Sequence, residues 1–163
     1  MRESLQGRTV VITGASSGMG LAMAHAFAHC GANLVLAARR EEPLRRAAQD
    51  CETLGSPALA VPSDVTDPAQ MGRLAQAAAD RFRRIDIWIN NAGLSLWGSF
   101  SDIPIEAQVQ LIQVNLIGVI NGTHAALPHM LAHGRRGTII NMASIGGGFR
   151  SPSRPPTAPA SSG

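Results

Sequence analysis

Three glycines, spaced four and two residues apart, are the first residues in this chain that could bind a ligand. Gly14, Gly18 and Gly20 lie between an apolar segment, residues 8–13, and a helix-forming segment, residues 21–30. Backbone N–H groups at such a strand-to-helix turn point outward, and the helix dipole favours an anion there. The turn therefore predicts a pyrophosphate-binding loop, and a glycine-rich structural turn without a ligand is the alternative. The candidate cofactor-binding residues of the turn are Gly14, Ser16, Ser17, Gly18, Met19 and Gly20.

Two arginines follow the next apolar segment, residues 33–38. In a dinucleotide-binding fold, an acidic residue at this point accepts hydrogen bonds from the adenosine ribose hydroxyls. Arg39 and Arg40 stand there instead, and a guanidinium binds phosphate through paired, charge-assisted hydrogen bonds. This exchange predicts NADP(H) rather than NAD(H), with Arg39 at the 2′-phosphate. The alternative is that both arginines are merely solvated.

Alternating apolar strands and helices must position these residues. Continuous apolar strands between helices are typical of a parallel sheet that is covered on both faces. A helix is expected to begin after Asp67, which has the side chain of an N-cap residue. The segment 104–132 is expected to form one long helix that is bent at Pro128. The further predicted strands are residues 58–61, 85–89 and 138–142, and a further predicted helix spans residues 44–54.

Composition narrows the class of protein. The chain has 163 residues, 45% of them apolar, which is enough for one domain with an aliphatic core. No apolar run is long enough for a transmembrane helix or resembles a secretory leader, so no membrane partner is expected. Cys30 and Cys51 form neither a disulfide framework nor a metal site, which favours the cytoplasm. The net charge of +3 comes from scattered arginines, so nucleic acid is not an expected partner.

An ordered set of motifs resembles the classical short-chain dehydrogenase/reductase family over residues 7–147. The turn at 13–20 is followed by Asp64 and Val65, by NNAG at 90–93, by Asn115 in the long helix and by Ser144 after the last strand. The resemblance implies an α/β fold with a Rossmann-like, doubly wound parallel sheet. About five strands would be present, and the sheet would be incomplete at its C-terminal side. Residues 1–147 would form the dinucleotide-binding domain.

The resemblance also implies a role for each of these residues. Asp64 would bond the adenine amino group with the Val65 backbone beside it, and Asn115 would hold a helix bend and a proton-relay water. Ser144 would hydrogen-bond the carbonyl or alcohol oxygen of the substrate. From the residues alone, an Asx turn at Asp64 and a plain loop hydroxyl at Ser144 stay open. The residues expected to line the ribose and nicotinamide side are Asn91, Ala92 and Gly93.

The residues that complete the family's chemistry are absent from this sequence. The resemblance implies a tyrosine as general acid/base and a lysine four residues later that lowers its pKa, and the chain contains neither residue type. Thr157 and Ser161 occupy the expected positions, in a tail, residues 148–163, that is expected to be disordered. Loss of one nucleotide near codon 152 would explain the tail, because restoring it allows tyrosine and lysine codons at these two positions. A fragment, a splice form or a divergent end is the alternative.

These observations favour an oxidoreductase that transfers hydride between NADP(H) and a small carbonyl or alcohol substrate, in a chain that is catalytically incomplete. Two other interpretations remain. One is a non-catalytic protein that binds NADP(H) or a partner, and the other is an unstable pseudogene product. The helix 104–132 is the expected surface of a homo-oligomer, because similar helices pair in oligomers of the family.

Overall fold

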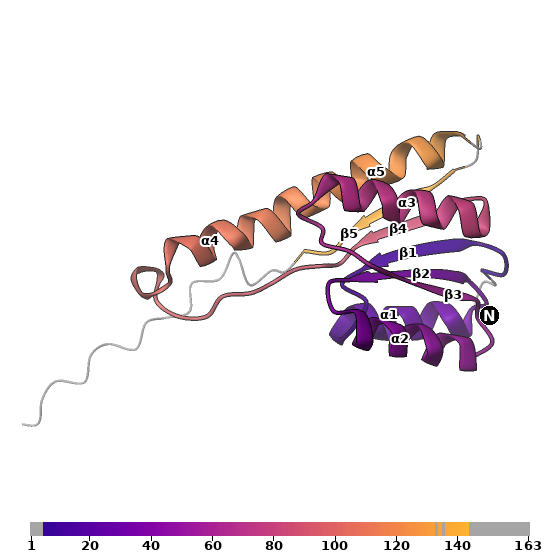
Figure 1. Cartoon of the computed structure of the whole chain (residues 1–163), viewed down its shortest axis with the longest axis horizontal. Helices are drawn as coiled ribbons and strands as arrows, with labels where there is room; N and C mark the ends of the chain where they lie inside the picture. Colours follow the sequence, from indigo (N-terminus) through magenta and orange to yellow (C-terminus); the bar gives the residue numbers. More distant parts are fainter. Residues whose placement is uncertain (1–4, 133, 135, 144–163) are drawn as a thin grey trace, which may run out of the picture.

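A five-stranded parallel sheet organises the chain (Figure 1). The computed structural model describes residues 5–132, 134 and 136–143. The strand order is β3-β2-β1-β4-β5, and every neighbouring pair is parallel. This confirms the expected α/β class and the five strands of a Rossmann-like sheet. The strands are β1 (Thr9–Thr13), β2 (Asn33–Ala38), β3 (Ala58–Pro62), β4 (Ile87–Asn90) and β5 (Thr138–Asn141).

Helices cover the sheet in two layers. In Figure 1, α1 (Gly18–His29) and α2 (Glu41–Thr53) lie on one face, and α3 (Pro68–Phe82) and α5 (Gly118–Ala132) lie on the other. Alternation along the strands divides the core between the layers. Val10 and Ile12 of β1 pack with the α1 and α2 layer, whereas Val11 belongs to the cluster of the opposite layer. All three side chains are fully buried, so β1 is the central strand of both cores.

The start of α3 shows how the sequence fixes a helix end. The Asp67 carboxylate accepts hydrogen bonds from the backbone N–H groups of Ala69 and Gln70, at 2.8 and 3.3 Å. The Gln70 side chain also donates to this carboxylate, at 2.8 Å, and this bond is the main reason that the pKa of Asp67 lies below its usual value. Pro68 occupies the first helical turn, where its missing N–H costs nothing. The predicted N-cap is therefore confirmed.

The long helix contains an irregular turn at Asn115, where the resemblance implied a helix bend. It runs through α4 (Ile105–Ile112), a π-helical turn at Gln113–Ile117, and α5 without leaving helical geometry. Pro128, the other position where a bend was expected, lies inside α5, and the π-helical turn is centred on Asn115. Figure 1 shows α4 extending beyond the edge of the sheet. Among the described residues, no helix has the length and apolar character needed to cross a membrane.

The strand order predicts where a ligand-binding crevice lies. The chain passes from β1 to β2 and β3 on one side, and then returns to β4 on the other side of β1. The loops that follow β1 and β4 therefore separate at the carboxyl edge of the sheet. Open α/β sheets bind their ligands at such a switch point.

Candidate functional site

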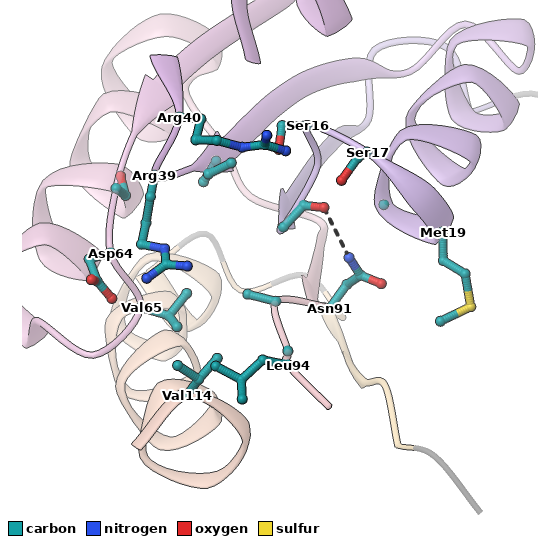
Figure 2. Close-up of a pocket in the computed structure, with 17 residues that line it drawn as sticks. Ser16, Ser17, Met19, Arg39, Arg40, Asp64, Val65, Asn91, Leu94 and Val114 are labelled. Atoms are coloured by element: carbon teal, nitrogen blue, oxygen red, sulfur yellow. Dashed lines mark hydrogen bonds between the residues drawn. The ribbon is translucent and has the colours of Figure 1, made fainter. Parts of the chain in front are cut away.

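A cavity of about 680 Å³ lies at this switch point (Figure 2). It is bordered by the segments that follow β1, β2, β3 and β4, and by the π-helical turn. Every residue predicted to bind the cofactor lines it except Gly18, which begins α1 beside it. The lining residues are Gly14, Ser16, Ser17, Met19, Gly20, Ala37, Ala38, Arg39, Arg40, Ser63, Asp64, Val65, Asn91, Ala92, Gly93, Leu94 and Val114.

The glycine turn is tight because its glycines meet backbone. Gly14 has a φ of +67°, and a Cβ at this position would lie 2.8 Å from the Cα of Ala92. A Cβ on Gly20 would lie 2.2 Å from the carbonyl oxygen of Gly14. At Gly18, in contrast, a Cβ would meet no atom within 4 Å. Gly14 and Gly20 therefore serve close packing, and Gly18 leaves open space at the helix start.

The start of α1 presents donors without a competing acceptor. Ser17 is the N-cap residue, but its hydroxyl makes no capping hydrogen bond. The first turn of α1 contains no acidic side chain. Unpaired N–H groups and the positive end of the helix dipole therefore lie beside the cavity, together with the exposed Ser17 hydroxyl. This arrangement suits a phosphate group.

Thr13 and Asn91 join the glycine turn to the loop after β4. The Thr13 hydroxyl accepts hydrogen bonds from the backbone N–H groups of Asn91 and Ala92, both at 3.0 Å. The Asn91 side-chain amide donates to the carbonyl oxygens of Thr13, at 2.9 Å, and Gly14, at 3.3 Å. Sequence reasoning missed Thr13, because an ordinary buried strand residue carries no signal for contacts with residues far along the chain.

Arg39 and Arg40 lie at the rim of the cavity, directly after β2. Both are exposed, and Figure 2 shows Arg40 reaching toward Ser16 while Arg39 lies on the side of Asp64. Within the described ranges, no carboxylate forms an ion pair with either arginine. The nearby acids Glu41 and Glu42 pair instead with arginines one turn further along α2. The two guanidinium groups therefore keep their charge available to a ligand.

The loop after β3 is stiffened by Asp64. One carboxylate oxygen of Asp64 accepts hydrogen bonds from the backbone N–H and the hydroxyl of Thr66, both at 2.9 Å. The backbone N–H of Asp64 donates to the Gln70 side chain at 2.9 Å. The Asx turn that the sequence left open is thus present. The turn occupies one carboxylate oxygen of Asp64, and Asp64 is one of the residues that line the cavity.

Asn115 holds the cavity wall that Leu94 lines, in the segment that follows β4. Its amide donates to the carbonyl oxygen of Leu94 and its own side-chain oxygen accepts from the N–H of Leu94, both at 2.9 Å. Gly93 lies close to this side chain, because a Cβ on Gly93 would be 3.3 Å from the Asn115 side-chain oxygen. The expected proton-relay role of Asn115 stays a prediction. Ser144, Thr157, Ser161 and the whole tail, residues 148–163, lie outside the described residues.

Among the described residues, the other titratable groups do not form a second centre. In the part of the chain that the structure describes, no three His, Cys, Asp or Glu side chains gather as metal ligands would. Burial, which is the largest contribution, raises the pKa of the Cys51 thiol to about 11, so it stays protonated near neutral pH. Cys51 therefore acts as a core residue of α2, and Cys30 is also a free thiol.

Comparison with known proteins agrees with this geometry. The sequence model of the short chain dehydrogenase family matches residues 8–157. An uncharacterized oxidoreductase of Bacillus subtilis is 37% identical over 145 residues, which are 89% of this chain and 41% of that protein. The 3beta-hydroxysteroid dehydrogenase 1 of Eggerthella lenta is 39% identical over 146 residues, 89% of this chain and 56% of that enzyme.

Solved structures agree as well. A short chain dehydrogenase/reductase from Burkholderia phymatum, in complex with NAD, is 35% identical with a TM-score of 0.86, covering 94% of this chain and 54% of that one. A short-chain type dehydrogenase/reductase from Mycobacterium marinum is 34% identical with a TM-score of 0.85, covering 90% and 59%. The chain spans about half the length of the relatives it matches. By family model, sequence and structure, the chain belongs to the short-chain dehydrogenase/reductase family.

Proposed function

We propose that this site binds NADP(H), and that the intact protein is an oxidoreductase interconverting a carbonyl and an alcohol in a small molecule. The observation that carries the choice of cofactor is the pair of arginines at the rim, Arg39 and Arg40, without a carboxylate partner in the described ranges. A 2′-phosphate carries charge that a guanidinium binds bidentately. The relative with NAD bound supports a nicotinamide cofactor in general.

The described residues fit such a cofactor. The open space at Gly18 and the uncapped start of α1 would receive the pyrophosphate, with the Ser16 and Ser17 hydroxyls beside it. Asp64 and Val65 would face the adenine. Asn91, Ala92 and Gly93 would line the ribose and nicotinamide side, with Asn115 behind them and Met19, which is exposed, at the rim. The nicotinamide supplies or accepts the hydride when it is bound.

The reaction of the family also needs a tyrosine and a lysine. This sequence contains no tyrosine, and all 14 basic residues are arginine. We therefore expect purified chain to quench or shift NADPH fluorescence on titration, to bind NADH more weakly, and to show no NADPH oxidation with a panel of ketones and aldehydes. Absence of NADPH binding would contradict the proposed site, and measurable turnover would contradict the need for the missing tyrosine and lysine.

Two alternatives need different tests: the DNA sequence for one, and thermal unfolding of the same preparation for the other. Binding without turnover would also suit a non-catalytic NADP(H)-binding protein, and only DNA sequence across codons 150–163 and beyond tells whether a lost nucleotide hides the tyrosine. Absence of a cooperative thermal transition would favour an unstable product. The free thiols Cys30 and Cys51 fit the cytoplasm, which we propose as the compartment.

We further propose a homo-oligomer through the long helix. Exposed apolar side chains on its outer face recur every three or four residues from position 105 to position 120, and again at positions 127 and 131. The π-helical turn adds one residue to the helix, so the step from 116 to 120 is four residues where three would continue the pattern. A stripe with this near-seven-residue period suits packing against a second helix. Six of its members, at positions 105, 109, 112, 116, 120 and 131, are at least half exposed. The stripe consists of Ile105, Val109, Ile112, Leu116, Ile120, Leu127 and Leu131.

A charge in the stripe is expected to separate the subunits. Ile120→Arg places a guanidinium where the paired helix would bury it, so we expect the dissociation constant of the oligomer to rise by about tenfold or more. Light scattering after size exclusion measures the mass. Gln110→Arg, at an exposed position outside the stripe, should leave the mass unchanged. Wild-type chain that is monomeric at micromolar concentration would refute this interface.

A further inference from the structure

We infer that Asn121 of α5 is a positioning residue for the adenine side of the NADP(H) site, an inference that rests on the proposed function. The Asn121 side-chain amide donates a hydrogen bond to the carbonyl oxygen of Val65, at 3.0 Å. Val65 is buried and lines the cavity directly after Asp64. Asn121 itself is not among the lining residues and acts through the loop.

A second contact shows that α5 is shaped to hold this loop. Gly118 lies one helical turn before Asn121, and a Cβ at Gly118 would be 2.6 Å from Cγ2 of Val65. Residues three apart share a face of a helix, so Gly118 and Asn121 approach the same loop residue together. The glycine lets the Val65 side chain touch the helix backbone, and the asparagine ties the Val65 backbone to the helix.

The other anchors of the loop come from different elements. The N–H of Ser63 donates to the carbonyl oxygen of Ala38 in β2, at 3.0 Å, and the N–H of Asp64 donates to Gln70 of α3. Asn121 adds the connection to α5, so the loop is fixed to a strand and two helices. A loop held on three sides keeps Asp64 at a fixed place in the cavity wall, which reduces the ordering that cofactor binding requires.

The long helix thereby holds two walls of the cavity with two asparagines. Asn115 holds Leu94, and Asn121, six residues later, holds Val65. Val114, between these contacts in the fold, lines the cavity itself, as Figure 2 shows. Loss of the Asn121 amide should therefore affect one half of the cofactor rather than the whole domain.

The test compares whole NADPH with its adenosine half, adenosine 2′,5′-bisphosphate. For Asn121→Ala, we expect both dissociation constants to rise by the same factor, about fivefold to tenfold, because the lost hydrogen bond holds only the adenine side. Asn121→Asp keeps the shape but turns a donor into an acceptor that repels the Val65 carbonyl, so a similar or larger increase is expected. Gln110→Ala removes an exposed amide from the same helical run and should change neither constant.

Each outcome has one meaning. Wild-type chain that binds neither NADPH nor the fragment would refute the proposed function. Wild-type binding with unchanged affinities in both Asn121 variants would refute the inference alone. A fall in NADPH affinity without a fall in fragment affinity would also refute it, as would failure of both variants to fold, because Asn121 would then hold the domain and not the loop.

Discussion

Gly20→Ala is expected to weaken NADPH binding by about 100-fold or more, and to lower the free energy of unfolding by about 2–3 kcal/mol. The added Cβ would lie 2.2 Å from the carbonyl oxygen of Gly14 and 2.7 Å from the Asn91 side-chain nitrogen. The Gly14 oxygen is backbone, so no rotamer change relieves the contact. α1 must move away from β1, which opens the turn and misplaces the N–H groups that would meet the pyrophosphate.

Gly72→Ala is the matched control for this substitution. Gly72 lies in α3, where an added Cβ meets no atom within 4 Å. Alanine favours the helix over glycine by about 0.5–1 kcal/mol, so this variant should be slightly more stable than wild type and bind NADPH equally well. Urea unfolding and NADPH titration measure both quantities. Wild-type affinity in Gly20→Ala would show that the turn tolerates a side chain and does not depend on close packing.

The parts of the fold that sequence predicted are those that depend on local pattern. Apolar runs and their spacing indicated the strands, and Asp67 with Pro68 indicated the start of α3, because capping involves residues only two or three apart. The glycine turn was also predictable, since the close approach of Gly20 to Gly14 involves residues only six positions apart. Local pattern indicated the lining residues of the glycine turn, and the family resemblance indicated Asp64, Val65 and residues 91–93.

The parts that sequence could not predict depend on contacts between distant residues. The Thr13 hydroxyl meets the N–H of Asn91, and the Asn121 amide meets the carbonyl of Val65. Either contact depends on strand register and on how α5 docks, which no local pattern encodes. The π-helical turn lies at Asn115, where the resemblance implied a helix bend, but the bond from Asn115 to Leu94 is again a contact between residues far apart in the chain.

The proposed cofactor binding and the proposed oligomer would share one element, the long helix. The inner face of the long helix holds the cavity walls through Asn115 and Asn121, and its outer face carries the apolar stripe defined above. The π-helical turn serves both faces. It aims Asn115 inward, and it shifts the phase of the helix so that Leu116 and Ile120 both stay exposed on the stripe. A change in this turn is therefore expected to affect both properties together.

Arg39→Asp is expected to reverse the choice of cofactor. The carboxylate would repel a 2′-phosphate and accept hydrogen bonds from a free ribose 2′-hydroxyl, as the acidic residue at this point does in NAD-binding folds. We expect the dissociation constant for NADPH to rise by about 100-fold and that for NADH to fall. Titration of both cofactors at two ionic strengths measures this. Wild-type NADPH affinity should fall with salt more steeply than NADH affinity, and the variant should lose that difference.

Two further variants separate the local effect from net charge. Arg39→Ala removes the attraction without adding repulsion, so its NADPH affinity should lie between those of wild type and Arg39→Asp. Arg73→Asp makes the same change in net charge on the exposed surface of α3, away from the cavity lining, and should leave both affinities near wild type. If Arg39→Asp kept wild-type NADPH affinity, the guanidinium would be solvated rather than bound to phosphate, and the assignment of NADP(H) would have to rest on Arg40 alone or be abandoned.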